Sequence, residues 1–336
     1  MSNSTPKMTM RMGSLRSALY ALVFALGLSG PVRAEVPQIT LQRDIVFQTI
    51  DGVELKLDLA IPQGPGPFPL ILCIHGGAWH VGDKSKLTPM IENLARHDYV
   101  AASINYRLAP KVTFPAPLDD TKAALHFLKT RAGRYKIDTT KVGGTGESAG
   151  AHMAMLMAFE EAQNESHKNP AKPADTELQA IVNYYGPVDL VHWSVTPMVD
   201  FLWRNHFHEG METTMLRFLG SSQKDSPIVQ AASPINYICK NCPPVLTFHG
   251  TLDPVVSFQQ AELLHAALRK AGVPEKLVPI PNGLHGGWSK EVKRKAEEQA
   301  VAFFDQYLKG KPDPTIEAHA AASGLDLSAS KQSSAR

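Results

Sequence analysis

The pentapeptide Gly146-Glu147-Ser148-Ala149-Gly150 places a serine where it could act as a nucleophile. It follows a short apolar run and precedes a Met- and Ala-rich helical pattern. A sharp strand-to-helix turn at this spacing strains the serine backbone and holds its hydroxyl at the carboxyl end of the sheet, near the positive end of the helix. Small residues on both sides let the strand and the helix approach closely. The pattern therefore predicts acyl transfer through Ser148.

The base and the acid for such a serine are expected later in the chain. His285 follows a predicted strand and precedes the last predicted helix, and Asp253 lies in the loop after the strand that ends at His249. We predict that Asp253 orients the imidazole of His285, which takes the proton of Ser148. His249 is the alternative base and is expected to be a structural neighbour. Two alternative acids lie in a long insertion, away from a strand end: Asp200 and Asp225.

A glycine-containing loop could stabilise the negative charge that this attack creates. His75-Gly76-Gly77-Ala78-Trp79 follows a buried apolar run, and its glycines allow the backbone to curl toward the serine. We predict that the backbone N–H groups of Gly76, Gly77 and Ala149 bind the oxyanion, while His75 shapes the loop. Bulky aromatic side chains are expected to line the substrate pocket: Trp79, Trp193 and Trp203.

Several other functional classes find no support. The chain has neither a Gly-x-Gly-x-x-Gly pattern nor a phosphate loop, and no His or Cys cluster at metal-ligand spacing, so we expect no cofactor and no metal. The formal net charge is +2 and no basic block is interleaved with aromatics, so no nucleic-acid partner is expected. Cys73 lies in an apolar run and should be buried. Cys239 and Cys242 indicate a local disulfide in an exported chain, or a redox pair or half a zinc site in a reduced compartment.

Apolar runs and helical patterns alternate along the chain, as expected when strands and helices succeed one another. An antiparallel hairpin with its turn at Asp51-Gly52 opens the series. This order predicts an α/β fold with a mostly parallel central sheet and helices on both faces. Strands are predicted at 43–49, 53–61, 70–74, 99–104, 141–145, 180–185, 245–249 and 276–279, and helices at 117–130, 149–161, 257–270 and 290–308.

The 336 residues suffice for one large domain flanked by two segments of other kinds. Residues 1–34 carry a basic start, a short apolar run and a small-residue site, which is typical of a cleaved signal peptide. We therefore expect a secreted or periplasmic protein without a stable membrane span after cleavage. The hydrolase-like domain is predicted over 35–309, with a cap-like insertion at 187–234, a polar loop at 160–176 and a disordered tail at 310–336.

The order of these motifs resembles that of known bacterial esterases. The series covers about residues 40–308 and resembles the acetyl-xylan/feruloyl-esterase-like and hormone-sensitive-lipase-like α/β-hydrolases. The resemblance implies catalysis by Ser148, Asp253 and His285, with Gly76 and Gly77 at the oxyanion site. Ala78 replaces the third glycine of the lipase-like motif, and few residues separate position 34 from the first strand. Both departures favour the acetyl-xylan/feruloyl-like branch. The motifs are His75–Trp79, Gly82–Lys84, Asn105–Pro110, Phe114–Asp120, Gly146–Gly150, Tyr185–Asp189, His249–Asp253 and His285.

The combined expectation is a serine carboxylic-ester hydrolase that forms an acyl-enzyme. The bulky insertion predicts short acyl groups, and acetyl or feruloyl esters of carbohydrates are candidate substrates. A prolyl-oligopeptidase-like peptidase or amidase is the alternative on the same triad, although such proteins carry a large extra domain for which this chain has no room. A non-catalytic relative would have lost the triad, whereas all three positions are filled here.

Overall fold

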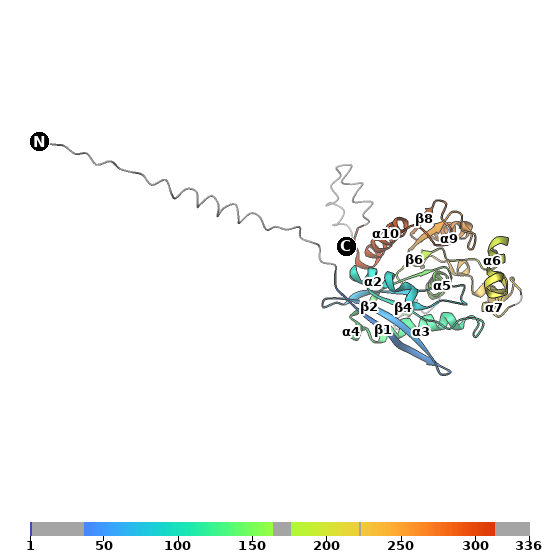
Figure 1. Cartoon of the computed structure of the whole chain (residues 1–336), viewed down its shortest axis with the longest axis horizontal. Helices are drawn as coiled ribbons and strands as arrows, with labels where there is room; N and C mark the ends of the chain where they lie inside the picture. The colour runs from blue at the N-terminus through green and yellow to red at the C-terminus, as the bar shows by residue number, and fades with distance from the viewer. Residues whose placement is uncertain (2–36, 164–175, 222, 313–336) are drawn as a thin grey trace. The chain divides into compact units, whose positions relative to one another are not determined.

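The computed structural model describes residues 1, 37–163, 176–221 and 223–312, and the compact unit that begins at Gln38 carries the fold (Figure 1). The predicted signal peptide lies outside the described residues, as do residues 313–336 of the predicted tail. Within the predicted polar loop, helix α5 continues to Gln163, and 164–175 are likewise outside the described part.

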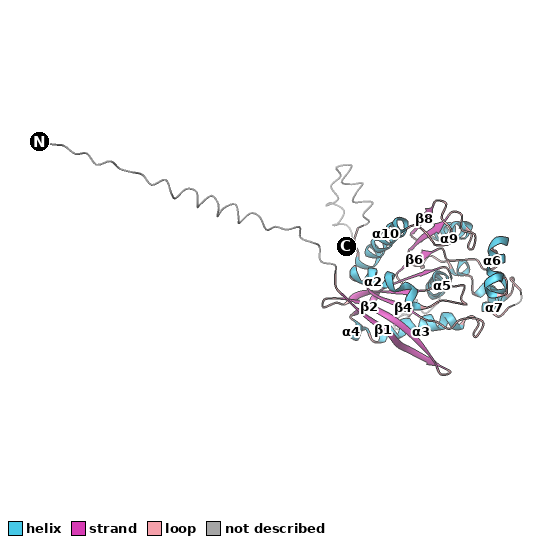
Figure 2. Cartoon of the chain, viewed as in Figure 1, coloured by secondary structure: helices cyan, strands magenta, loops and turns pink. Residues whose placement is uncertain are grey.

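The described residues form one eight-stranded sheet in the order β1-β2-β4-β3-β5-β6-β7-β8 (Figure 2). Strands β1, β2 and β4 pair antiparallel, and all the other pairs are parallel, which confirms the predicted mostly parallel sheet. Every predicted strand is present. The bounds are β1 Ile39–Ile50, β2 Val53–Pro62, β3 Phe68–Ile74, β4 Val100–Ile104, β5 Ile137–Glu147, β6 Ala180–Tyr184, β7 Val245–Gly250 and β8 Glu275–Ile280.

The hairpin that opens the sheet turns at Asp51 and Gly52, as predicted. Both residues have positive φ values, 50° and 77°, which the right-handed twist of a two-residue hairpin requires. The first two strands are therefore joined by a tight turn. Each parallel strand that follows needs a crossover connection, which brings the chain back to the end of the sheet where the previous strand began.

Helices cover both faces of the sheet. Successive side chains of the central strand point to opposite faces, so each face is apolar and packs against helices. Leu70, Leu72 and Ile74 of β3 face the core that contains α3, α5 and α9, whereas Ile71 and Cys73 face the core that contains α2 and α10. The buried position predicted for Cys73 is confirmed. The helix bounds are α2 Thr88–Arg96, α3 Ala116–Thr130, α4 Ala132–Tyr135, α5 Ala149–Gln163, α9 Phe258–Ala271 and α10 Lys290–Lys309.

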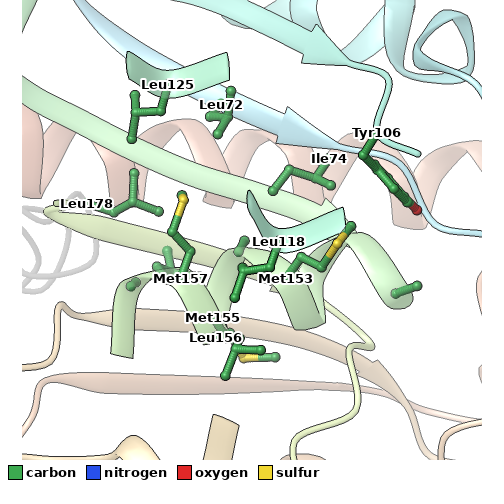
Figure 3. Packing of buried hydrophobic residues seen from close by; sticks show 14 of the residues in the cluster. Leu72, Ile74, Tyr106, Leu118, Leu125, Met153, Met155, Leu156, Met157 and Leu178 are labelled. Carbon is green, nitrogen blue, oxygen red and sulfur yellow. The ribbon is translucent and has the colours of Figure 1, made fainter. Parts of the chain in front are cut away.

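Helix α5 is the central helix of the larger core, since it is buried along nearly its whole length. Its Met and Ala side chains pack against α3 and the sheet; Figure 3 shows Met153 and Met157 in one cluster with Leu118 of α3 and Ile74 of β3. Met side chains are flexible and can fill irregular gaps, so they suit the interface between α5 and β3. This packing holds the start of α5 in place, directly after Ser148.

The insertion at 187–234 contains helices that the sequence did not predict. Thr196 caps α6 through its side chain, which accepts from the N–H of Val199, and Gly220 ends α7 in the left-handed conformation. Pro residues at the first turns of α6 and α8 fit the start of a helix, where no N–H donor is needed. The bounds are α6 Pro197–Phe207, α7 Met211–Leu219, α8 Pro227–Ala231 and the 3₁₀ turn η3 Pro234–Tyr237.

Trp79 joins the loop after β3 to this insertion. Its ring stacks on Phe218 of α7 with centroids 4.5 Å apart, and its indole N–H donates to Nδ1 of His152 over 3.3 Å. His152 lies in α5, is completely buried, and its Nε2 is 2.7 Å from the carbonyl of Ala232. These contacts fit one neutral tautomer, in which Nδ1 accepts and Nε2–H donates.

Acidification should weaken the fold through His152. Burial lowers the pKa of His152 to about 4, whereas an unfolded histidine titrates near about 6.5. The unfolded chain therefore binds the proton first, and stability is lost as the pH falls from about 6.5 to about 4, by about 3 kcal/mol at most. The free energy of unfolding is measured by chemical denaturation at about pH 7.5 and at about pH 5. The decrease between these two pH values should be smaller for His152→Gln than for the wild-type protein, because glutamine offers the same acceptor and donor without titrating.

His97→Gln serves as the control for this measurement, because His97 is exposed. This variant should retain the pH dependence of the wild-type protein. Equal pH dependence in wild type and His152→Gln would contradict the assignment of the effect to His152.

The Cys239–Cys242 pair is not bridged, so the predicted local disulfide is absent from this structure. The sulfur atoms lie 3.8 Å apart, and the Cys242 sulfur accepts the N–H of Cys239. Burial raises the pKa of the Cys242 thiol to about 12, so the thiol form is favoured.

Candidate active site

Ser148 occupies a strained turn between β5 and α5. Its φ is 52°, and its backbone N–H donates to the carbonyl of Tyr184 over 2.9 Å. A Cβ at position 150 would lie 2.0 Å from the carbonyl oxygen of Ile74, so glycine is required where α5 crosses β3. The predicted strand-to-helix turn is therefore present, and packing of α5 maintains the strain at the serine.

His285 and Asp253 reach Ser148 from neighbouring strand ends. Nε2 of His285 is 2.9 Å from the Ser148 hydroxyl oxygen, and Nδ1 is 2.7 Å from Oδ2 of Asp253. The three residues follow β5, β7 and β8, whose carboxyl ends lie at the same edge because these strands are parallel. With Nδ1–H donating to the carboxylate, Nε2 is free to accept the serine proton. The structure thus brings together the three residues that the sequence grouped.

Asp253 is held rigidly as a carboxylate. Its Oδ1 accepts the N–H groups of Val255 and Val256 at 2.8 and 2.9 Å, and its Oδ2 faces His285. Burial alone would raise the pKa of the carboxyl, but the hydrogen bonds from His249 and His285 outweigh it and hold the pKa at about 2. The carboxylate is therefore ionised in any neutral solution and can stabilise a cationic His285.

His249 and Asp200, two alternatives weighed from the sequence, have other contacts. His249 is completely buried; its Nε2 lies 2.7 Å from the Val256 carbonyl and 3.3 Å from Oδ2 of Asp253. His249 is therefore a structural neighbour of the triad, as predicted. Asp200 accepts from Arg204 within α6 and from the N–H of Met211.

The loop after β3 faces Ser148 with its two glycines. Gly77 has a φ of 124°, and a Cβ there would lie 1.9 Å from the carbonyl of Val81, so only glycine fits. Within the described part of the chain, the N–H groups of Gly76 and Gly77 have no hydrogen-bond acceptor. Ala149 opens α5, where the first N–H groups are also without helical partners. Gly76 and Gly77 line the same cavity as Ser148, and Ala149 directly follows the serine, so these N–H groups remain the candidate donors to the oxyanion.

A cavity of about 290 Å³ opens above Ser148, and we call it the ester pocket. Part of its lining is apolar, and we call this part the apolar wall: Val199, Trp203, Met211 and Val255. Of the residues in this wall, only Trp203 was predicted from the sequence. The proximity of the other side chains depends on how the insertion folds against the loop after β7. Its lining residues are His75, Gly76, Gly77, Ala78, Lys86, Glu147, Ser148, Tyr185, Val199, Trp203, Met211, Val255 and His285.

Two of the three tryptophans predicted to line the pocket do not reach it. Trp79 is 1% exposed, because it stacks on Phe218, and Trp193 is 3% exposed, with its indole N–H donating to the Val255 carbonyl at 2.9 Å. Both serve packing, whereas Trp203 lines the cavity and donates to Thr214 at 2.9 Å. Of the other insertion aromatics, Phe218 is buried, Phe201 is 58% exposed, and the side chain of Phe207 lies outside the described residues.

Tyr185 is a pocket residue that sequence reasoning quoted in a motif without assigning it a role. It directly follows β6 and has a φ of 47°. Its ring meets His285 edge-on, with centroids 4.7 Å apart, and so supports the imidazole from the side. Tyr185 follows the strand that lies between the strands preceding Ser148 and Asp253. This position could have predicted that Tyr185 lies at the site.

Residues 57–268 match the BD-FAE family, and this segment includes Ser148, Asp253 and the glycine loop. The chain belongs to the BD-FAE family. This membership confirms the resemblance inferred from the motifs. The BD-FAE segment ends before His285, which the structure nevertheless places against Ser148.

Named relatives of this BD-FAE chain are esterases. Esterase LipQ of Mycobacterium tuberculosis is 31% identical over 242 residues, which are 70% of this chain and 54% of that protein. Versiconal hemiacetal acetate esterase of Dothistroma septosporum is 27% identical and covers 81% of this chain and 80% of its own length. The chain spans about half the length of the first curated relatives that it matches.

Solved structures establish the α/β-hydrolase fold of this BD-FAE protein. A truncated carbohydrate esterase from gut microbiota superimposes with a TM-score of 0.66 at 22% identity, covering 82% of this chain and 98% of that one. The butyrate-bound esterase Est2 of Thermogutta terrifontis gives 0.63 at 24%, covering 83% and 97%. Among the described helices, none is both long and apolar enough to cross a membrane.

Proposed function

We propose that this protein is a serine carboxylic-ester hydrolase that acts on short-chain acyl esters through an acyl-enzyme. The observation that carries the proposal is the hydrogen-bonded series from Ser148 through His285 to Asp253, open to a pocket that also contains the two glycines. The esterase names of the relatives support the ester as substrate and do not favour the peptidase alternative.

The geometry supports the following steps. His285 Nε2 takes the proton as Ser148 Oγ attacks the acyl carbon, and the N–H groups of Gly76, Gly77 and Ala149 stabilise the oxyanion. Collapse breaks the bond to the leaving alcohol, whose oxygen receives the proton from His285. Water, deprotonated by His285, then attacks the acyl carbon of the acyl-serine. The bond from that carbon to Ser148 Oγ breaks, Oγ receives the proton from His285, and the carboxylic acid leaves. Asp253 remains a carboxylate throughout and stabilises the imidazolium.

The ester pocket should select acyl groups from acetyl to about butyryl. The apolar wall bounds a cavity of only about 290 Å³, and Trp203 is its largest side chain. A methylene that fits contributes about 0.8 kcal/mol, whereas one that meets the wall weakens binding. Measured over 4-nitrophenyl esters of about two to sixteen carbons, kcat/KM should peak at about four carbons or fewer.

Trp203→Ala should shift this maximum to longer chains, because it removes the largest side chain of the wall. Phe201→Ala is the matched control, since Phe201 lies in the same helix but is mostly exposed to solvent. A wild-type maximum at about eight carbons or more would refute the preference for short acyl groups.

A further inference from the structure

Tyr106 lies beyond the end of β4, in the motif Asn105–Pro110, and is not among the residues that line the ester pocket. Strands β4 and β5 flank β3, so Tyr106 approaches the loop after β3 from one neighbouring strand and Ser148 from the other. The Tyr106 ring is buried, and its hydroxyl oxygen lies 3.0 Å from the carbonyl oxygen of His75. Burial raises the pKa of Tyr106, so the hydroxyl keeps its proton and donates to this carbonyl.

The carbonyl of His75 and the N–H of Gly76 belong to the same peptide unit. This unit is trans, since the cis peptides of the described residues all precede proline. A trans peptide is planar, and its C=O and N–H point in opposite directions. A hydrogen bond that holds the carbonyl therefore also sets the direction of the N–H. Through this bond, Tyr106 fixes the N–H of Gly76, which is one of the candidate donors to the oxyanion.

The side chain of His75 holds the next peptide unit in the same way. Its Nδ1 lies 2.8 Å from the carbonyl oxygen of Gly76, and this oxygen can only accept, so Nδ1 carries the proton. Burial lowers the pKa of His75, and the ring is neutral in neutral solution. Gly82 leaves room for the contact, because a Cβ there would collide with Nδ1 of His75. The bond sets the direction of the Gly77 N–H, the second candidate donor.

The ring of Tyr106 also supports the ring of His75. The two rings stack with centroids 4.4 Å apart and an angle of 17° between their planes. Stacking keeps the imidazole in the orientation in which Nδ1 faces the Gly76 carbonyl. Both N–H groups are therefore held in place before a substrate binds. Donors that are fixed in advance need no reorganisation when negative charge develops on the substrate oxygen.

We propose that Tyr106 is a positioning residue for the oxyanion site. Its hydroxyl orients the N–H of Gly76 through the His75 carbonyl, and its ring orients the N–H of Gly77 through the His75 imidazole. Tyr106 acts through the loop after β3, since its side chain does not line the ester pocket. The assignment rests on the proposed ester hydrolysis and extends it to a residue outside the pocket.

Tyr106→Phe tests this assignment, because it removes the hydroxyl and keeps the ring. With 4-nitrophenyl acetate, kcat should fall about tenfold while KM stays within about twofold. Formation and hydrolysis of the acyl-enzyme both pass through an oxyanion, so both steps slow together, whereas the bound ester carries no such charge. A short trifluoromethyl ketone, whose adduct with the serine carries an oxyanion, should lose affinity by about the same factor as kcat/KM.

Tyr237→Phe is the matched control. The Tyr237 hydroxyl also donates to a backbone carbonyl, that of Ala231 at 2.9 Å, but Tyr237 lies in η3 and contributes nothing to the loop after β3 or to the lining of the ester pocket. This variant should keep the wild-type kcat, KM and affinity for the ketone.

A pair of variants at His75 tests the second peptide unit. The side-chain N–H of asparagine can replace Nδ1 as donor to the Gly76 carbonyl, whereas leucine has no donor. The kcat of His75→Leu should therefore be about tenfold below that of His75→Asn, at similar KM. This pair decides the assignment if Tyr106→Phe does not fold, because equal kcat values would mean that the imidazole N–H does not position Gly77.

The outcomes separate this assignment from the proposed function. A wild-type protein that hydrolyses no ester would refute the proposed function. With an active wild type, an unchanged kcat in Tyr106→Phe would overturn the role of Tyr106 alone. The same conclusion would follow if kcat fell without a matching loss of affinity for the trifluoromethyl ketone, because a general disturbance of the fold would then explain the loss.

Discussion

Ser148→Ala should reduce kcat for 4-nitrophenyl acetate by about five to six orders of magnitude while the protein stays folded. The Ser148 hydroxyl oxygen lies 2.9 Å from Nε2 of His285, so removal of the hydroxyl eliminates both attack and the acyl-enzyme. Alanine fits the site, since only the hydroxyl is lost. The N–H groups of Gly76 and Gly77 are unchanged and could leave a small residual rate above the uncatalysed reaction.

A fluorophosphonate probe provides an independent measurement of the same residue. The probe should form a covalent bond with Ser148 in the wild-type protein, and peptide mass spectrometry should find it on no other serine. Ser257→Ala is the matched control, because Ser257 lies in the loop that carries Asp253 and its hydroxyl makes no cap bond to α9. This control should keep both labelling and turnover. Labelling of the Ser148→Ala protein, or substantial turnover by it, would rule out Ser148 as the nucleophile.

The sequence predicted the group of Ser148, Asp253 and His285 because one rule of geometry relates motif order to position. Each residue follows a strand, and parallel strands place their carboxyl ends at one edge of the sheet. Gly150 was predicted to allow a close approach of strand and helix, which the structure confirms through the short distance from position 150 to the Ile74 carbonyl. The sequence pattern was therefore sufficient to predict those site residues whose positions depend on strand order and on backbone geometry.

Side-chain surroundings could not be predicted in the same way. Trp79 and Trp193 have the size of pocket residues, yet Phe218 and Val255 bury them through contacts that form only after the insertion has folded. A cavity of about 370 Å³ beside His285 is lined by Lys86 near α2, Glu147 of β5 and Lys293 of α10, which no local pattern connects. Helix α2 was also missed, although Ile91 and Leu94 have the spacing of a buried helical face.

Asp253→Asn should lower kcat by about three to four orders of magnitude, with little change in stability. The asparagine oxygen can replace Oδ1, which accepts the N–H groups of Val255 and Val256 at 2.8 and 2.9 Å. Its amide NH₂ then takes the place of Oδ2, 2.7 Å from Nδ1 of His285. Two donors cannot face each other, so His285 must place its proton on Nε2. In that tautomer Nε2 cannot accept the proton of Ser148.

A second Asp–His pair on the surface supplies the matched control for this variant. Asp189 accepts the N–H groups of Val191 and His192 with Oδ1, and its Oδ2 lies 2.7 Å from Nδ1 of His192, which is exposed. Asp189→Asn therefore makes the same local exchange away from Ser148, and kcat should stay within about twofold. Because the pKa of Asp253 is about 2, the wild-type carboxylate stays ionised in the assay, and the comparison needs no acidic pH. A loss of less than about tenfold in Asp253→Asn would mean that another acid orients His285.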